Sequence, residues 1–376
     1  MPPINHSMLS ASSANRWMAC PPSAKLNANS EDTGSDFARE GTCAHELCEY
    51  KIRKLLGEDV QNPTENLDFY DAEMESCSDE YTSYIGECIA AAKQKCSDPI
   101  VLVEQRLDFS EYVPNGFGTG DCVIVADDTL FIVDFKYGQG VEVKAENNPQ
   151  MMLYALGALV FFDSLYDIAN ISMSIFQPRL SNISEWQISK AALLDWAENT
   201  LKPIAELAAK GEGEFKAGEH CRFCKVKATC RKRAEYNLEL AKYDFAVPDT
   251  LEPIEIAAIL SKAEELSAWA ADIKEYALEQ ALHEVTFDGF KVVEGRSVRK
   301  YKDETAVAET VSNAGFDPFE KSVLGITAMT KLLGKAKFEE LLGGLIVKPK
   351  GKPTLVPISD KRAAINTAAE DFKEDV

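Results

Sequence analysis

The sequence lacks any apolar run long enough to cross a membrane. The longest, Leu153 to Phe162, is about half of the length that a spanning helix needs. The first ten residues also lack the basic-then-apolar pattern of a secretion signal, so we expect a cytoplasmic protein. No internal repeat or low-complexity segment is present, and the 27% of charged residues fits an ordinary soluble globular protein.

Positive charge is scarce. Lys and Arg number 40 against 61 Asp and Glu, which leaves a net charge of −21. This balance counts against a large nucleic-acid footprint, because phosphate binding needs Lys and Arg. It does not exclude DNA, because a metal-dependent site is itself acidic and a local basic groove can lie within an acidic surface. The 376 residues, 45% hydrophobic, suffice for one large domain or two to three small ones.

The ten cysteines fall into two groups. Six are scattered and are expected to pack as small apolar side chains: Cys43, Cys48, Cys77, Cys88, Cys96 and Cys122. Three others lie close together in HCRFCKVKATC, as Cys221, Cys224 and Cys230. In a reducing compartment such a cluster more often binds metal than forms disulfides. Cys20, before a rigid Pro-Pro, is the candidate fourth ligand, with His220 as a substitute; the spacing suits zinc and an iron–sulfur cluster equally.

Hydrophobic patterning predicts a mixed α/β fold. Helices are expected at 8–20, 42–56, 71–95, 149–163 and 188–210, and strands at 100–107, 121–126, 129–135 and 170–177. After Arg233 the chain becomes rich in Ala, Glu and Leu. There we expect helices at 234–244, 251–284 and 303–343, with a β-hairpin over 285–301. The predicted division is a domain of residues 1–240 and a helical, hairpin-containing accessory region of residues 241–376.

The most informative segment is GTGDCVIVADDTLFIVDFKYGQG, residues 118–140. A two-residue turn at Asp127-Asp128 would place Asp121 directly opposite Asp134. Opposed like charges destabilise a sheet, so this pairing predicts a divalent cation between the two carboxylates. Lys136 would project from the same face as Asp134. The alternative is two surface aspartates with a lysine paired to one, and a three-residue turn would break the opposition.

Two flanking helices carry further polar pairs at helical spacing. His45 and Glu49 share a helix face, as do Gln150 and Tyr154. Thr42 could cap the first of these helices. Each pair also has a structural interpretation, with His45 as an ordinary helical histidine and Gln150 and Tyr154 as the exposed edge of an apolar helix.

Together these segments resemble the motif series of RecB-like PD-(D/E)xK nucleases: GTCAHELCE (41–49), G-D (120–121), DFK (134–136) and QMMLY (150–154). The resemblance covers roughly residues 8–233 and implies a restriction-endonuclease-like core. It implies Mg²⁺ or Mn²⁺ held by His45, Asp121, Asp134 and the main-chain carbonyl of Phe135. Lys136 would orient or activate the attacking water, and Gln150 and Tyr154 would support the site and contact DNA. Glu104, on the preceding strand, can add to the site although no motif requires it.

One cysteine near the start and three after the core resemble the iron–sulfur branch of this family, which includes the AddB nuclease domain and the CRISPR-adaptation nucleases. The resemblance implies a [4Fe–4S] cluster on Cys20, Cys221, Cys224 and Cys230, with zinc as the alternative. A basic run surrounds these cysteines: Lys225, Lys227, Arg231, Lys232 and Arg233. It is either a DNA-backbone contact or a solvated helix face.

The layout of the whole chain looks like that of phage-encoded RecB-like proteins. We therefore expect a metal-dependent DNA nuclease, an exonuclease acting at DNA ends in phage replication or recombination. Its expected partners are single-stranded or end-containing DNA, a recombination or single-strand-binding protein, and further copies of itself. The competing hypotheses are a non-catalytic DNA-binding scaffold on the same fold and a zinc-stapled interaction module. Cleavage polarity and strand preference stay open.

Overall fold

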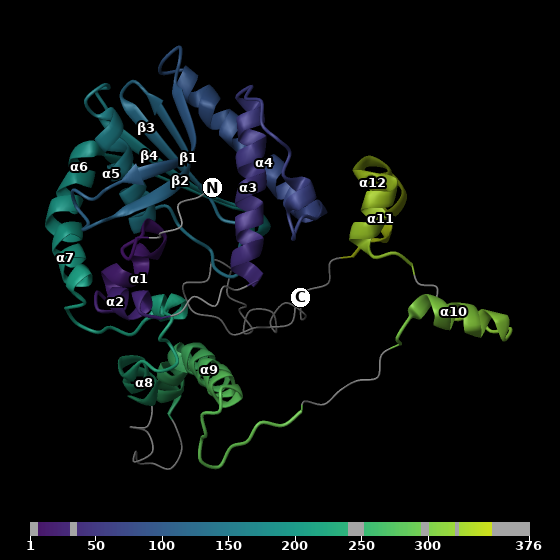
Figure 1. Cartoon of the computed structure of the whole chain (residues 1–376). Coiled ribbons are helices and arrows are strands. Elements are labelled where there is room, and N and C mark those ends of the chain that lie inside the picture. Colours follow the sequence, from purple (N-terminus) through teal and green to yellow (C-terminus); the bar gives the residue numbers. More distant parts are fainter. Residues whose placement is uncertain (1–6, 31–35, 240–251, 295–300, 320–322, 348–376) are drawn as a thin grey trace, which may run out of the picture. The chain divides into compact units, whose positions relative to one another are not determined.

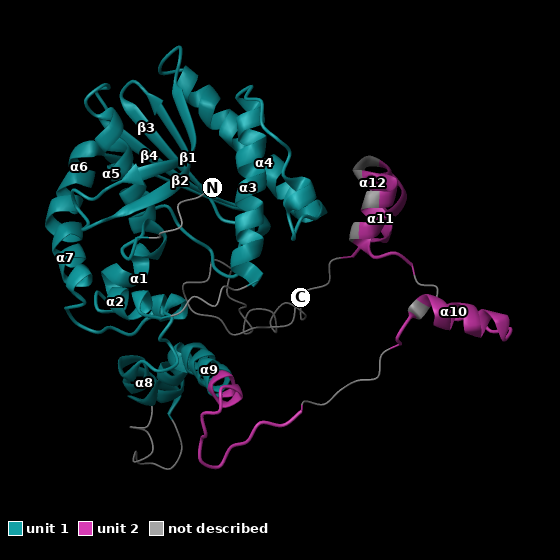
Figure 2. Ribbon diagram, viewed as in Figure 1, with its two compact units in different colours: residues 1–277 teal, residues 278–376 magenta. Residues whose placement is uncertain are grey.

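The computed structural model describes residues 7–30, 36–239, 252–294, 301–319 and 323–347 (Figure 1). The chain forms two compact units, residues 1–277 and residues 278–376 (Figure 2). Each is considered by itself.

The first unit is built on a mixed sheet, as the patterning predicts, and the sheet has five strands. The strands lie in the order β1-β2-β3-β4-β5, with β3 and β4 parallel and the other neighbours antiparallel. Their bounds are β1 Ile100–Asp108, β2 Phe117–Ala126, β3 Thr129–Phe135, β4 Asn170–Gln177 and β5 Asn182–Ser189. The edge strand β5 was not predicted. Its residues alternate between half-buried and exposed positions, so it offers no apolar run to detect.

Helices cover both faces of this sheet. One buried core joins the strands to α5 (Pro149–Phe162) and to the short helices at the start of the chain. The other joins them to α3 (Asp36–Leu55) and α4 (Ala72–Lys93). Figure 1 shows α3 and α4 along one side of the sheet and α5 on the other. The α5 helix connects the parallel strands β3 and β4, as a parallel connection requires.

Side-chain caps explain where two of the long helices begin. The Asp71 carboxylate accepts a hydrogen bond from the N–H of Met74 at 2.7 Å, and the Asn148 side chain accepts from the N–H of Gln150 at 3.0 Å. The α3 helix begins earlier than predicted, so Thr42 is not its cap. Thr42 lies inside the helix, where its hydroxyl donates to the carbonyl of Ala38 at 3.0 Å.

The first unit contains several shorter elements. They are η1 Ala11–Ser13, α1 Ala14–Ala19, α2 Ser23–Ala28, η2 Thr64–Asn66, η3 Pro178–Leu180, α6 Lys190–Trp196, a π-helical turn Ala197–Leu201, α7 Lys202–Lys210, η5 Glu219–Phe223 and α8 Arg231–Leu238. The long helix α9, Pro253–Leu282, begins in this unit.

A buried arginine holds α9 against α8. The Arg233 side chain is 1% exposed, and its guanidinium lies 2.6 Å from Glu265 and 2.5 Å from Asp272. Lys227 adds a third ion pair, 2.7 Å from Asp272. The compact unit therefore extends past residue 240 to include most of α9.

The second unit is helical in its described part: α10 Glu304–Asn313, α11 Ile326–Leu333, α12 Lys335–Leu342 and η7 Gly343–Leu345. The hairpin predicted over 285–301 is not formed at residues 285–294, and residues 295–300 lie outside the described part. The expected turn is present, with the N–H of Phe290 donating to the carbonyl of Phe287 at 3.0 Å. A two-stranded hairpin that no further strand or helix supports is only marginally stable. The alternation of apolar and polar residues predicted the two strands but could not show that such support is missing. Among the residues described, no helix is long and apolar enough to cross a membrane.

Candidate metal centre

Three carboxylates form a row across neighbouring strands. The β2–β3 ladder runs as predicted to the pair Cys122–Val133, so the next pair in this register is Asp121 and Asp134. The β1–β2 ladder pairs Val103 with Cys122 and Gln105 with Gly120, which places Glu104 opposite Asp121. We call Glu104, Asp121 and Asp134 the acidic row. Opposed like charges on adjacent strands destabilise a sheet, and a cation relieves their repulsion.

Glu104 interrupts the regular strand β1. Its φ of 50° lies in the left-handed region, and its own pairing with Asp121 is missing from the ladder. Non-glycine residues in this conformation are strained and concentrate at functional sites. No sequence motif singled out Glu104; only the register on both sides of Asp121 shows that it completes the row.

His45 of α3 reaches this row from the helical layer. Its Nδ1 lies 3.4 Å from Oδ1 of Asp121, and its ring packs edge-on against Phe135 with centroids 5.4 Å apart. One ligand atom each from His45, Glu104 and Asp121 lie within 4.8 Å of one another, and no other such group occurs among the described residues. Imidazole and carboxylate donors at this spacing fit a divalent cation of the Mn²⁺ or Mg²⁺ type.

Asp134 lies near the end of β3, and Lys136 directly follows this strand. The Asp134 carboxylate is almost completely buried, and Lys136 Nζ lies 2.9 Å from its Oδ2. That oxygen is buried and has no other polar contact, so the Lys136 ammonium is its partner in the free protein. The main-chain N–H of Phe135 donates to Oδ2 of Asp121 at 2.7 Å. Ligation through the Phe135 carbonyl stays a prediction.

Gln150 and Tyr154 of α5 form a hydrogen-bonded chain that ends on Asp134 of the acidic row. The Gln150 amide donates to Oδ1 of Asp134 and to the Tyr154 hydroxyl, each at 3.1 Å. Both side chains are buried, so the alternative of an exposed helix edge is wrong. Gly118 lets Tyr154 approach, because a Cβ at Gly118 would lie 2.9 Å from the tyrosine ring. Direct contact of Gln150 or Tyr154 with DNA stays a prediction.

Glu49 does not join the site. Its carboxylate instead pairs with Arg53 on the same helix at 2.8 Å. Arg53 also donates to the carbonyl of Val103, next to Glu104. The pair therefore braces α3 against β1 at the edge of the acidic row.

Burial and close charges shift the pKa values of the groups in the site. Burial and the neighbouring Asp121 raise the pKa of Glu104 to about 8. Burial would lower the pKa of His45, but Asp121 outweighs it and raises that pKa to about 9. Burial also raises the pKa of Asp134, whereas His45 and Lys136 overcome burial and lower the pKa of Asp121. A cation would replace these protons as the partner of the carboxylates.

The four predicted cluster ligands do meet. Cys20, Cys221, Cys224 and Cys230 all line one small cavity of about 20 Å³, beside Arg16, His220 and Arg233. Four thiols are the donor set of tetrahedral zinc and of an iron–sulfur cluster alike, so this cavity does not select between the two.

Lys227 and Arg233 of the basic run pair with Asp272, whereas Lys232 is exposed and lies 3.6 Å from Glu235 on the same helix. These contacts favour a structural role for Lys227 and Arg233 over a free DNA-binding surface.

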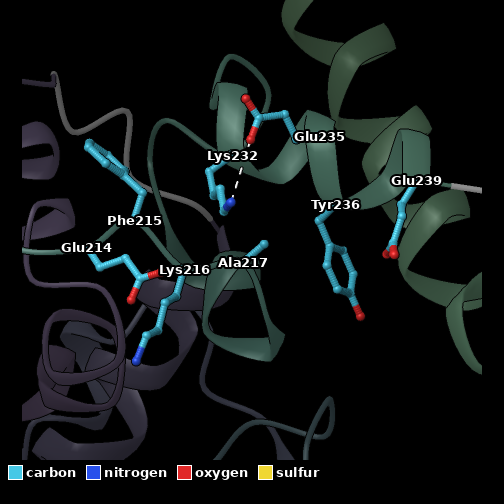
Figure 3. Close-up of a pocket in the computed structure, with 8 residues that line it drawn as sticks. All are labelled: Glu214, Phe215, Lys216, Ala217, Lys232, Glu235, Tyr236 and Glu239. Carbon is cyan, nitrogen blue, oxygen red and sulfur yellow. Dashed lines mark ion pairs between the residues drawn. The ribbon is translucent and has the colours of Figure 1, made fainter.

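A larger cavity of about 370 Å³ lies between the loop before η5 and helix α8 (Figure 3). Its lining mixes both charges with two aromatic rings: Glu214, Phe215, Lys216, Ala217, Lys232, Glu235, Tyr236 and Glu239. None of these residues belongs to the acidic row or to the cysteine set. The mixture selects no ligand class, so the acidic row remains the stronger candidate for chemistry.

Comparison with known proteins gives a family and several structural likenesses. A family model described as "Protein of unknown function (DUF2800)" matches residues 6–363. Among solved structures, the chain is similar to one described as "Crystal structure of SSO0001", at 12% identity over 50% of this chain and 94% of that one, with a TM-score of 0.23.

Proposed function

The chain belongs to the DUF2800 family of proteins of unknown function, and we propose that it is a metal-dependent DNA nuclease. The observation that carries this proposal is the acidic row with Lys136 paired to its last member. Glu104 and Asp121 offer ligand atoms within 4.8 Å of each other and of His45 on α3, and Asp134 follows the last β2–β3 ladder pair, Cys122–Val133. Carboxylates for a cation beside one ammonium for a phosphate are what phosphodiester hydrolysis needs.

Each side chain of the site has a separate role in the proposed hydrolysis. Mg²⁺ or Mn²⁺ would be held by His45, Glu104, Asp121 and Asp134, and when bound it would stabilise charge on the phosphate and acidify water. Lys136 Nζ, 2.9 Å from Asp134, is placed to orient a water molecule or neutralise a phosphate oxygen. Gln150 fixes the orientation of Asp134 through the hydrogen bond to Oδ1.

We propose that the metal site in the cysteine cavity stabilises the fold and takes no part in catalysis. A [4Fe–4S] cluster on Cys20, Cys221, Cys224 and Cys230 would tie the start of the chain to the segment after the core. Arg233 lines the same cavity and pairs with α9, so this tie would extend to α9. Zinc is the alternative occupant.

The substrate we propose is DNA with a free end, which makes the protein an exonuclease of phage replication or recombination. The test uses labelled linear and circular DNA, single- and double-stranded, with Mn²⁺ or Mg²⁺. Asp134→Asn and Lys136→Met should each lower the rate at least about a hundredfold, the scale expected for loss of preorganised charge stabilisation. The matched controls are Asp167→Asn and Lys93→Gln, which remove charges from exposed positions.

Cleavage of linear DNA alone would identify an exonuclease. A wild-type protein that cuts nothing, or site variants that cut as well as the controls, would refute the nuclease proposal. DNA binding without cleavage would favour the non-catalytic scaffold on the same fold.

Metal analysis of protein purified without oxygen tests the second metal site. A brown protein absorbing near 400 nm, whose iron is lost in Cys221→Ser, is the expected result. One equivalent of zinc without iron would overturn the cluster and favour the zinc-stapled form.

A further inference from the structure

One arginine lies on the same side of the sheet as the candidate metal ligands and is stacked on an aromatic ring. Arg106 pairs with Thr119 in the β1–β2 ladder, and its guanidinium lies 4.0 Å from the centre of the Phe117 ring. Phe117 is two residues from Thr119, so it is the diagonal cross-strand neighbour of Arg106.

The direction of Arg106 follows from a change of face within β1. Leu102 and Leu107 both pack in the core under α5, although regular alternation would point them to opposite sides. The change falls where Glu104 adopts its positive φ. Arg106 alternates with Leu107, so it points to the other face of the sheet, on which α3 and His45 lie.

This placement puts Arg106 beside the acidic row. It is two residues beyond Glu104 on the same strand, about 7 Å along it. Its partner Thr119 is likewise two residues from Asp121. The side chains beside the acidic row are thus the guanidinium of Arg106, the hydroxyl of Thr119 and the aromatic ring of Phe117.

Arg106 has no ion-pair partner in the described part of the chain, and its side chain is exposed. The acid closest to it on the strand, Asp108, is engaged with the N–H of Ser110 at 2.8 Å. Arg106 also interacts with Asp108 across a longer distance. In a protein with a net charge of −21, an exposed arginine that lies over an aromatic ring beside an acidic site needs an explanation. A stacked guanidinium also keeps its N–H groups at the rim of the plane, where they can hold a phosphate in a bidentate contact.

We propose that Arg106, held flat by Phe117, binds a backbone phosphate of the nucleic-acid strand next to the phosphate that is hydrolysed. The identity of the ligand rests on the proposed nuclease function. Arg106 adds to the positive charge of Lys136, and it sets the direction in which the strand crosses the acidic row. Phe117 is a positioning residue that acts through Arg106.

The test measures binding separately from cleavage. Full-length protein is titrated into a fluorescein-labelled single-stranded DNA with Ca²⁺ in place of Mg²⁺, over a series of KCl concentrations. Arg106→Gln should weaken binding about tenfold, as expected for one charge-assisted contact. It should also reduce the slope of log Kd against log salt by about 0.7, the value for one phosphate on a single strand. Lys93→Gln removes the same charge from an exposed site on α4 and should change neither quantity.

Two further variants separate the role of the stack from that of the charge. Arg106→Lys should keep the salt slope but bind more weakly than wild type, because it loses the planar contact. Phe117→Leu should raise KM while leaving kcat close to wild type. The melting temperature of each variant should stay near that of wild type, which excludes loss of fold.

The outcomes distinguish this proposal from the nuclease function. If Asp134→Asn abolishes cleavage while Arg106→Gln binds and cuts like wild type, the Arg106 proposal fails and the nuclease function stands. If wild type binds DNA without cutting it and Arg106→Gln weakens that binding, the phosphate contact stands and the nuclease function fails. If wild type binds no DNA even at low salt, both fail.

Discussion

Glu104 of β1 lies opposite Asp121 of β2 at the position where the β1 backbone adopts a left-handed φ of 50°. The two carboxylates and His45 offer ligand atoms within 4.8 Å of one another. Opposed carboxylates at a strained position are unfavourable in the free protein. A cation bound between these groups would stabilise the folded protein. The effect of metal on the free energy of unfolding is therefore a direct test of the metal site.

Glu104→Gln should weaken Mn²⁺ binding and at the same time stabilise the metal-free protein. The change removes one carboxylate from the row, so repulsion falls while a ligand is lost. We expect affinity to drop by about 10- to 100-fold, as when groups that support a metal site are removed. Calorimetric titration with Mn²⁺ and thermal unfolding in EDTA measure the two effects. Glu46→Gln, exposed on α3, is the control; equal behaviour of the two variants would remove Glu104 from the site.

Stability of the metal-free protein should fall as pH rises from about 4.5 to about 9. The pKa of Glu104 rises from an ordinary 4.5 to about 8, and that of His45 from 6.5 to about 9. Between these values the folded state holds protons that the unfolded chain has released, so raising the pH favours unfolding. The lowered pKa of Asp121 acts only below about pH 4 and does not oppose this trend.

Denaturant unfolding in EDTA across this pH range measures the slope. Glu104→Gln should flatten the fall in stability between about pH 5 and 8 and leave the fall that is due to His45. Excess Mn²⁺ should abolish or reverse the dependence of stability on pH, since a cation takes the place of the protons. A stability that rises with pH in EDTA would contradict the protonation states described for the site.

Gly118→Ala should destabilise the protein by about 1–3 kcal/mol, the usual cost of overpacking. Its Cβ would lie 2.9 Å from the Tyr154 ring, whose hydroxyl contacts the Gln150 amide. The push on Tyr154 should also disturb Asp134 and slow any cleavage. Gly140→Ala is the matched control, because a Cβ there meets nothing within 4 Å. Equal melting temperatures for the two variants would show that β2 and α5 are not packed this closely.

Arg233→Leu should destabilise the first unit by about 3–5 kcal/mol, because it leaves Glu265 and Asp272 without their buried partner. Arg231→Leu, at an exposed position of the same helix, should cost less than about 0.5 kcal/mol. Chemical denaturation measures both. Proteolysis within α9 should increase in the first variant alone. If α9 stays protected in Arg233→Leu, the ion pairs do not hold it to α8.

Local chemistry made much of the site predictable. The two-residue turn at Asp127-Asp128 sets the β2–β3 register, which the structure follows from Ala126–Thr129 to Cys122–Val133, the pair before Asp121 and Asp134. Helical spacing likewise placed Gln150 and Tyr154 on one face, one turn apart. These relations depend only on backbone geometry over a few residues, so they can be read from the order of the amino acids.

Three other relations depended on packing between distant segments. Glu104 enters the site because β1 pairs with β2 and changes face at that residue. Cys20 meets the later cysteines only because α1 and η5 pack together, and Arg233 is buried only because α9 lies against α8. Turn and helix geometry constrain neighbours along the chain, whereas these contacts are selected by the burial of whole surfaces. By itself the sequence determined the acidic hairpin and its lysine; the tertiary structure decided which other side chains face it.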